Sequence, residues 1–507
     1  MPDLLEQYAK KTLNSRVYAV AKETPLEIAP NLSARLNNRI FLKREDLQPV
    51  FSFQLRGAYN KMTTLSEEER KLGVITASAG NHAQGVALAA KRMGIPALIV
   101  MPKTTPQIKV DAVLSWDAEV VLHGNAYDDA YEHAMKLVAE RKLSFIPPYD
   151  DPDVIAGQGT VGVEILKQHP GPIEAVFIPV GGGGLAAGVT AFIKHTRPDV
   201  KIIAVEPDES PCLYEAMQAH ERVILDQVGI FADGVAVRQI GKEPFKILEH
   251  HIDDVIVVST DEICAAIKDI FDDTRVIAEP AGALTVAGVK KYVASTGISG
   301  RDFVAIVSGA NINFDRLRHV AERAELGEHR EALLCATIAE QPGSFRQFCD
   351  LIGMRGITEF NYRYSDAKEA HVFAGVQLSG GEEEKDALLS KLKQHNYPVV
   401  DLTDNEMAKI HIRYMVGGRT DLVNNERLFR FEFPERPGAL LRFLKHIGGR
   451  WNISLFHYRN HGSAYGRVLV GIQVPAADET AFQSFLDCLG YHYHEETDNP
   501  AYKLFLR

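Results

Sequence analysis

Cysteine is scarce in this sequence, and its spacing does not suggest a disulfide framework. The 507 residues include five scattered cysteines, never spaced as C-x-x-C, at positions 212, 264, 335, 349 and 488. An odd number without paired spacing argues against a scaffold built on disulfides. We therefore expect reduced, buried thiols in a cytoplasmic protein.

Long apolar runs and an excess of basic residues are also missing. No apolar stretch reaches the length needed to cross a bilayer. The first residues lack the basic start and apolar core of a signal peptide, so we expect none. Lysine and arginine number 56 against 67 aspartates and glutamates, which gives a formal net charge of −11. This balance disfavours nucleic acid or an anionic membrane as the main partner.

The sequence does contain enough apolar material for large cores, because 46% of its residues are hydrophobic. In the first 320 residues, short aliphatic runs alternate with helical patterns, as at 81–93 and 185–195. The runs are typical of strands buried on both faces and lie at residues 74–76, 97–101, 176–180, 202–205 and 304–307. This alternation predicts an α/β fold with a parallel sheet.

After the charged stretch 318–330, an internal repeat begins. Matching segments recur at an offset of 94 to 96 residues: 340–345 with 435–440, Gly353 with Gly448, 357–363 with 453–459, 375–377 with 471–473, and 403–405 with 497–499. A near-constant offset of this kind indicates a duplication. Each copy is predicted to run strand, helix, strand, strand, helix, strand, which is a ferredoxin-like α+β pattern. A structural or dimerising appendage without a ligand is the alternative interpretation.

Three loops of the first region carry the residues that suggest chemistry. The run Pro179-Val180-Gly181-Gly182-Gly183-Gly184-Leu185 follows a predicted strand and opens a helix. Glycines allow close backbone approach, and the free amides of a helix start can hold a phosphate. A tight turn without a ligand, or a nucleotide site, would give the same pattern. It is not the spaced G-x-G-x-x-G dinucleotide motif.

The other two loops offer polar side chains at the ends of strands. Ser78-Ala79-Gly80-Asn81-His82 precedes a helix and supplies hydroxyl, amide and backbone donors suited to a carboxylate. Ser308-Gly309-Ala310-Asn311 follows the last strand of the region. Taken alone, helix capping explains the first loop and an ordinary turn explains the second.

Together with three further segments, these loops resemble the pyridoxal-phosphate (PLP) dependent serine/threonine dehydratases. The further segments are Lys43-Arg44-Glu45-Asp46, Ser52-Phe53-Gln54-Leu55-Arg56-Gly57-Ala58 and Ala278-Glu279-Pro280-Ala281-Gly282-Ala283. With its repeated C-terminal region, the whole chain looks like the biosynthetic threonine dehydratases (threonine deaminases). The resemblance implies a two-lobed, tryptophan-synthase-β-like PLP fold (fold type II) followed by tandem ACT-type regulatory repeats.

The resemblance also implies domain boundaries and roles for residues. The catalytic domain would span 1–320, a linker 321–330, and the repeats 331–404 and 426–507 with a connector at 405–425. The cofactor would be held by Phe53, Asn81, Gly181, Gly182, Gly183, Gly184, Leu185 and Ser308. Asn81 would face the pyridine hydroxyl and Ser308 the pyridine nitrogen. The substrate would meet Ser78, Ala79, Gly80, Asn81, His82 and Glu279.

No metal site is expected. In some relatives Glu206 would begin a cation-binding loop that has a carboxylate six residues later, but here that position is Cys212.

Gln54 stands where the family carries the lysine that holds PLP as an imine, removes the substrate α-proton and releases the product. A carboxamide is neither a nucleophile nor a base, so the chain is expected to be inactive or severely impaired. PLP would then bind non-covalently, or as an imine with the substrate amine at best. Lys61, about 10 Å further along the helix, and Lys43 are not expected to substitute.

The function implied by the family is conversion of L-threonine to 2-oxobutanoate and ammonia, the first step of isoleucine biosynthesis, with L-serine as a secondary substrate. Isoleucine and valine are the expected effectors, and a homotetramer is the expected assembly. The alternative is a non-catalytic regulatory protein that binds amino acids.

Overall fold

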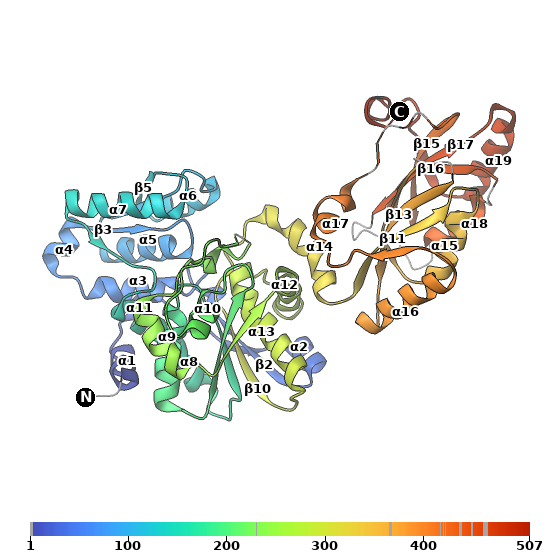
Figure 1. Ribbon diagram of the computed structural model, residues 1–507. Coiled ribbons are helices and arrows are strands. Elements are labelled where there is room, and N and C mark those ends of the chain that lie inside the picture. The colour runs from blue at the N-terminus through green and yellow to red at the C-terminus, as the bar shows by residue number, and fades with distance from the viewer. Residues whose placement is uncertain are drawn as a thin grey trace. The chain divides into compact units, whose positions relative to one another are not determined.

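The computed structural model describes residues 4–229, 231–364, 368–415, 417–418, 420, 422–434, 439–447, 450–459 and 465–506. The chain divides into two compact units, residues 1–324 and 325–507 (Figure 1). No described helix is long and apolar enough to cross a membrane.

The first unit contains a six-stranded sheet in the order β1-β2-β10-β7-β8-β9, parallel except for the edge strand β1. The strands are β1 Leu26–Ile28, β2 Arg39–Arg44, β7 Ala175–Pro179, β8 Lys201–Pro207, β9 Asp254–Val258 and β10 Asp302–Val307. The central strands β7 and β10 are buried along their whole length. Burial on both faces explains their unbroken apolar sequences and confirms the expected parallel sheet.

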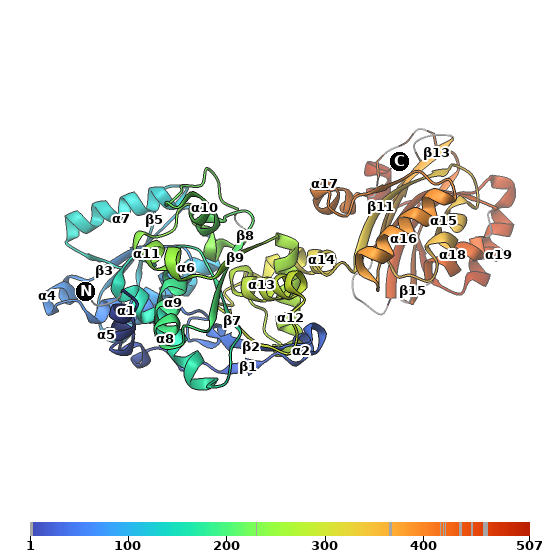
Figure 2. The same ribbon diagram turned by 60° about the horizontal axis from the view of Figure 1, so that its bottom comes forward.

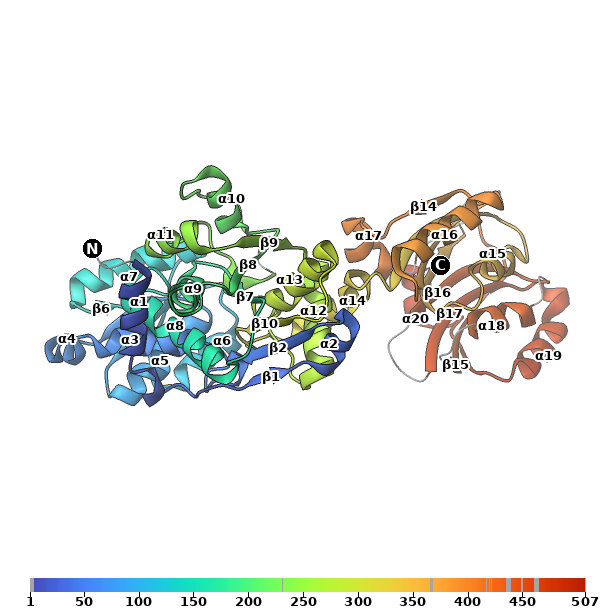
Figure 3. The ribbon, with the colours of Figure 1, turned by 90° about the horizontal axis from the view of Figure 1, so that it is seen from below.

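Helices cover both faces of this sheet, as Figure 3 shows for α8 and α9 on one side and α12 and α13 on the other. The helices on the first side are α1 Leu4–Leu13, α8 Pro152–Gln168, α9 Gly184–Thr196, α10 Cys212–Ala219 and α11 Lys242–His251. Those on the other side are α2 Pro30–Leu36, α12 Thr260–Thr274, α13 Pro280–Thr296 and α14 Leu317–Gly327.

A smaller lobe is inserted between β2 and β7 and has its own parallel sheet, in the order β5-β4-β3-β6. Its strands are β3 Val74–Ala77, β4 Ala97–Met101, β5 Glu119–Leu122 and β6 Ser144–Phe145. Its helices are α3 Gln54–Thr63, α4 Glu67–Leu72, α5 Asn81–Met93, α6 Gln107–Leu114 and α7 Tyr127–Arg141. Helices α3, α5 and α6 share a core on one face, and α7 packs on the other.

Helix α3 packs very closely against α5 of its own lobe and against α8 of the large lobe. A Cβ atom at Gly85 of α5 would lie 2.9 Å from the Leu55 nitrogen, and one at Gly157 of α8 would lie 2.7 Å from the Arg56 oxygen. Such spacing is possible only for glycine. The start of α3 is therefore held on two sides, and Gln54 is its first residue.

The second unit is one eight-stranded sheet in the order β14-β11-β13-β12-β16-β17-β15-β18. The first repeat supplies β11 Glu331–Ala339, α15 Ser344–Ile352, β12 Ile357–Arg363, β13 Glu369–Gln377, α16 Gly381–Gln394, β14 Val399–Asp401 and α17 Glu406–Ile410. The second supplies β15 Glu426–Pro434, α18 Ala439–Ile447, β16 Asn452–Arg459, β17 Tyr465–Gln473, α19 Glu479–Leu489, β18 His492–Glu495 and α20 Pro500–Phe505.

The predicted order of elements is therefore confirmed in both repeats. They join through antiparallel pairing of β12 with β16. Figure 2 shows α15, α16, α18 and α19 in front of the sheet, and one apolar core contains residues of all four helices. The Pro437-Gly438 turn and Gly448, which the repeat analysis used, lie outside the described residues.

Candidate active site

The glycine loop lies between the end of β7 and the start of α9. Gly183 has φ +89° and caps the helix, whose first amides have no partner within the helix itself. A Cβ atom at Gly182 would lie 2.1 Å from the Tyr149 ring, and one at Gly181 would lie 2.9 Å from the Cα of Val235. The loop is thus enclosed by neighbouring chain while its helix start offers donors to an anion. This arrangement fits a phosphate group.

Asn81, the first residue of α5, joins two other segments through its side chain. Its Nδ2 donates to Glu279 Oε1 at 2.6 Å, and its Oδ1 accepts from Asn311 Nδ2 at 2.7 Å. Asn311 Nδ2 also donates to the Val50 carbonyl at 2.8 Å. Glu279 occupies the N-cap position of α13, and Asn311 follows β10. Three of the sequence motifs therefore meet here.

Ser308 lies beside the same segments. The Phe53 amide donates to the Ser308 carbonyl at 3.2 Å, and the buried Ser308 hydroxyl donates to the Ala281 carbonyl at 3.3 Å. A serine hydroxyl has one proton. To donate to a pyridine nitrogen, the hydroxyl would have to turn away from Ala281, and the long existing contact makes that change inexpensive.

Gln54 is half-buried at the start of α3, next to this cluster. Its Oε1 accepts from Gln158 Nε2 at 3.3 Å, a long and therefore weak hydrogen bond. The two lysines that could be considered as substitutes for an amine at position 54 form ion pairs elsewhere. Lys61 forms an ion pair with Asp151 at 2.7 Å, and the fully buried Lys43 forms one with Glu164 at 2.6 Å.

The turn η3, Asp233–Val235, connects Glu279 with the glycine loop. Val235 approaches Gly181, and a Cβ atom at Gly234 would lie 3.7 Å from Glu279 Oε1. Burial, followed by the nearby charge of Asp233, raises the pKa of Glu279 to about 7, against the opposing effects of Asn81 and Lys109. Lys109 of the small lobe forms an ion pair with Asp233 at 2.6 Å. The site thus contains a carboxyl group that can be neutral or charged near neutral pH.

His82 enters the site region as a neutral ring. Burial lowers its pKa to about 4, and its Nε2 lies 2.9 Å from the Ile146 carbonyl, which requires the proton on that nitrogen. Its Nδ1 has no partner among the described residues and can only accept. The ring therefore cannot donate to a carboxylate from Nδ1. Donors to a carboxylate would instead be backbone amides of the loop and the Ser78 hydroxyl, whose oxygen accepts from the Gly80 amide at 3.2 Å.

Glu206 binds the first turn of α10 and is not part of the cluster around Asn81 and Glu279. Its carboxylate accepts from the amides of Leu213 and Tyr214, both at 2.8 Å, and from Cys212 Sγ at 3.5 Å. Burial raises its pKa to about 7. Among the described residues, no group of three or more His, Cys, Asp or Glu could hold a metal ion.

Sequence reasoning missed three residues of this region, Tyr149, Asp233 and Lys109, and it did not predict the contact of Asn311 with Asn81. Only Asn311 lay within a motif singled out from the sequence. The other three are separated from the motifs by long stretches of chain, and no spacing pattern marks them.

Comparison with known proteins defines the class and then the family. Residues 18–309 match the model of the pyridoxal-phosphate dependent enzymes, and residues 322–412 and 418–506 match the C-terminal regulatory domain of threonine dehydratase. The fold and the glycine loop between β7 and α9 agree with the first match. The chain is therefore a PLP-dependent protein of the expected two-lobed fold with ACT-like regulatory repeats, which confirms the expected fold class and cofactor.

Within this class the chain belongs to the biosynthetic threonine dehydratases. It is 57% identical to the L-threonine dehydratase biosynthetic IlvA of Burkholderia multivorans, over 98% of this chain and 99% of that protein. The identity is 54% with the Escherichia coli protein of the same name, over 99% of this chain and 97% of that protein. A solved structure of the processed form of threonine deaminase isoform 2 from Solanum lycopersicum is 51% identical. It covers 64% of this chain and 90% of its own, with a TM-score of 0.63.

Proposed function

We propose that this chain is the scaffold of a threonine dehydratase in which Gln54 occupies the position of the lysine that binds PLP. The observation that supports this is the position of Gln54 itself, at the start of α3, one residue after the Phe53 amide that donates to Ser308. The reaction that this scaffold would support with a lysine at position 54 is the conversion of L-threonine to 2-oxobutanoate and ammonia, with L-serine as a secondary substrate. PLP, when bound, withdraws electrons from the substrate α-carbon. Gln54 can neither accept the α-proton nor attack as an amine, so activity is absent or severely reduced.

In this proposal the protein's other residues keep their binding roles. The amides from Gly181 to Leu185 hold the phosphate, Asn81 donates to the pyridine hydroxyl, and Ser308 donates to the pyridine nitrogen. Phe53 packs against the ring. Ser78 to His82 and Glu279 lie beside the substrate, and Tyr149 keeps the glycine loop in shape.

The same proposal extends to organisation and location. Residues 1–320 form the catalytic domain, 321–330 the linker, 331–404 and 426–507 the regulatory repeats, and 405–425 their connector. The assembly is a homotetramer, the compartment is the cytoplasm, and no metal is required. A second candidate function, a non-catalytic regulatory protein that binds amino acids, is favoured by the single fact that Gln54 lacks an amine.

PLP should bind this chain reversibly and without a covalent link to any lysine. Lys43 and Lys61 are both held in ion pairs, and Lys43 is fully buried. After borohydride reduction, peptide mass mapping should find no pyridoxyl group on either residue, while equilibrium dialysis shows that PLP is retained. A stoichiometric adduct on Lys61 or Lys43, or no retention of PLP with threonine present, would contradict this prediction.

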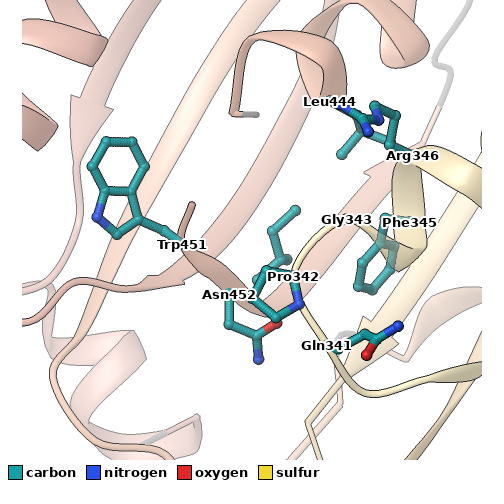
Figure 4. Close-up of a pocket in the computed structure, with 9 residues that line it drawn as sticks. Gln341, Pro342, Gly343, Phe345, Arg346, Leu444, Trp451 and Asn452 are labelled. Atoms are coloured by element: carbon teal, nitrogen blue, oxygen red, sulfur yellow. The ribbon is translucent and has the colours of Figure 1, made fainter. Parts of the chain in front are cut away.

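We infer that isoleucine and valine bind the regulatory unit at a small pocket lined by residues of both repeats. The pocket lies between the loop that follows β11 and the start of β16 (Figure 4). It is lined by Gln341, Pro342, Gly343, Phe345, Arg346, Leu444, Trp451, Asn452 and Ile453.

Both ends of an amino acid find partners near this pocket. Gly343 has φ +92° and caps α15, whose first amides can receive a carboxylate. Glu340 precedes the pocket loop and accepts hydrogen bonds from Tyr362 and from Asn452 Nδ2, the latter at 3.0 Å. Its carboxylate can attract an ammonium group, while Phe345 and Ile453 contact an aliphatic side chain.

Two phenylalanines of α15 provide a matched test of this pocket. Phe345 lines it, whereas Phe348 lies in the same core without lining it. Calorimetry on the full chain should show isoleucine binding that Phe345→Ala weakens about tenfold or more, because apolar contact is lost. Phe348→Ala, which costs similar packing, should bind isoleucine nearly as well as the parent. Equal weakening by both variants, or no isoleucine binding by the parent chain, would reject the pocket.

A further inference from the structure

Three side chains form a series that crosses the candidate active site. Asn311 donates through Nδ2 to Asn81 Oδ1, and Asn81 donates through Nδ2 to Glu279 Oε1. The series is anchored at the Val50 carbonyl, which accepts from the same Asn311 nitrogen. All three side chains are at least partly buried, so water competes weakly for these bonds.

The partners determine which way the Asn81 amide faces. A carbonyl such as that of Val50 only accepts, so the Asn311 nitrogen must be the atom near it. That nitrogen in turn requires the oxygen of Asn81. The Asn81 nitrogen is then left for Glu279, whose Oε1 accepts. One N–H of Asn81 is used in this bond, and its second N–H remains available.

We propose that Glu279 is a positioning residue that acts through Asn81: by accepting from Nδ2 it fixes the amide, together with Asn311, so that an N–H, and not the carbonyl, faces the cofactor. This inference rests on the proposed placement of the PLP hydroxyl beside Asn81. With the amide reversed, the Asn81 oxygen would meet the cofactor oxygen, and two acceptors repel each other. The binding of PLP therefore depends on a residue that need not contact it.

The surroundings of Glu279 keep its acceptor in place. Its side chain is 5% exposed, and a Cβ atom at Gly309 would lie 2.4 Å from Oε1, so a larger residue at 309 would displace the carboxyl group. Asp233 of η3 and Lys109 of α6 are the charged groups that act on it, with opposite signs. Because either protonation state retains an oxygen that can accept, the proposal requires an acceptor at this position and not a negative charge.

The test measures the PLP dissociation constant of the full-length chain by equilibrium dialysis. The absence of a covalent link at Gln54 makes this constant measurable. Asn81→Ala and Glu279→Ala should each weaken PLP binding about tenfold or more, as expected for loss of a buried hydrogen bond. Glu279→Gln, which keeps an acceptor oxygen, should stay within about threefold of the parent. In the Asn81→Ala background, Glu279→Ala should add less than about twofold, since both act through one group.

The outcomes separate this inference from the proposed site. If Asn81→Ala leaves PLP binding unchanged, the placement of the cofactor beside Asn81 is wrong and the inference fails with it. If Asn81→Ala weakens binding but Glu279→Ala does not, or if Glu279→Ala weakens both backgrounds equally, only the positioning role is overturned. Asn311→Ala tests the same series from its other end should Glu279→Ala fail to fold. It too should weaken PLP binding only while Asn81 is present.

Discussion

The Gln54→Lys variant should release 2-oxobutanoate from L-threonine several orders of magnitude faster than the parent chain. A correctly placed base alone contributes roughly 10²–10⁴-fold, and the amine also restores a nucleophile that the carboxamide cannot provide. The structure has room for the change, because Gln54 is only half-buried and its hydrogen bond from Gln158 is a long 3.3 Å. A coupled assay for the 2-oxoacid measures the gain.

Gln54→Arg is the matched control for this experiment. It adds a cation of similar reach, but a guanidinium stays protonated and is not a nucleophile, so its activity should remain at the level of the parent. A Gln54→Lys protein that is folded and loaded with PLP yet stays at background would mean that the chain has another defect. It would favour the non-catalytic regulatory function.

Replacing Arg56 by methionine should reduce the free energy of unfolding by roughly 3–5 kcal/mol, the usual cost of breaking a buried ion pair from one side. Arg56 is completely buried near the start of α3. It donates to both oxygens of Glu45, at 2.7 and 2.8 Å, and to both oxygens of Glu164, at 2.6 and 3.0 Å. Without the guanidinium, Glu45 and Glu164 would remain as buried carboxylates with only Lys43 to balance them.

Urea denaturation of the parent and the variant measures this loss. Lys10→Met is the control, because Lys10 also pairs with a glutamate, Glu6 at 2.7 Å, but on an exposed surface. Such surface pairs contribute between zero and about 1 kcal/mol. If Arg56→Met and Lys10→Met cost the same, the buried ion pairs of Arg56 with Glu45 and Glu164 do not stabilise the fold more than a surface pair does.

The architecture could be predicted from the sequence because its signals are periodic. Apolar strands such as β7 and β10 are buried on both faces and leave an uninterrupted pattern. The duplication is visible as a near-constant offset between matching segments, and the structure has the expected order of elements in both copies. Local patterns suffice for such features, since each depends on neighbouring residues.

The candidate site was only partly accessible in this way. Asn81 and Ser308 lie in loops that follow predicted strands, whereas Glu279 was indicated only by the resemblance to the dehydratase family. The structure brings the three segments together. The bond between Asn81 and Glu279 joins residues 198 positions apart, and Lys109 meets Asp233 across 124 positions. Contacts at that separation leave no local pattern. The neutral state of His82 also could not be predicted, because it results from burial by the assembled fold.

The pairing of β12 with β16 makes the two regulatory repeats halves of a single hydrogen-bonded sheet. Two such modules on separate chains would associate to an extent set by protein concentration. Here the partner is always supplied by the same polypeptide, at a fixed effective concentration. The pocket between Phe345 of one repeat and Leu444 of the other is consequently present in every molecule. A response to isoleucine at this pocket should need no dilution-sensitive dimerisation of the repeats, and its midpoint should not change with the amount of enzyme in the cell.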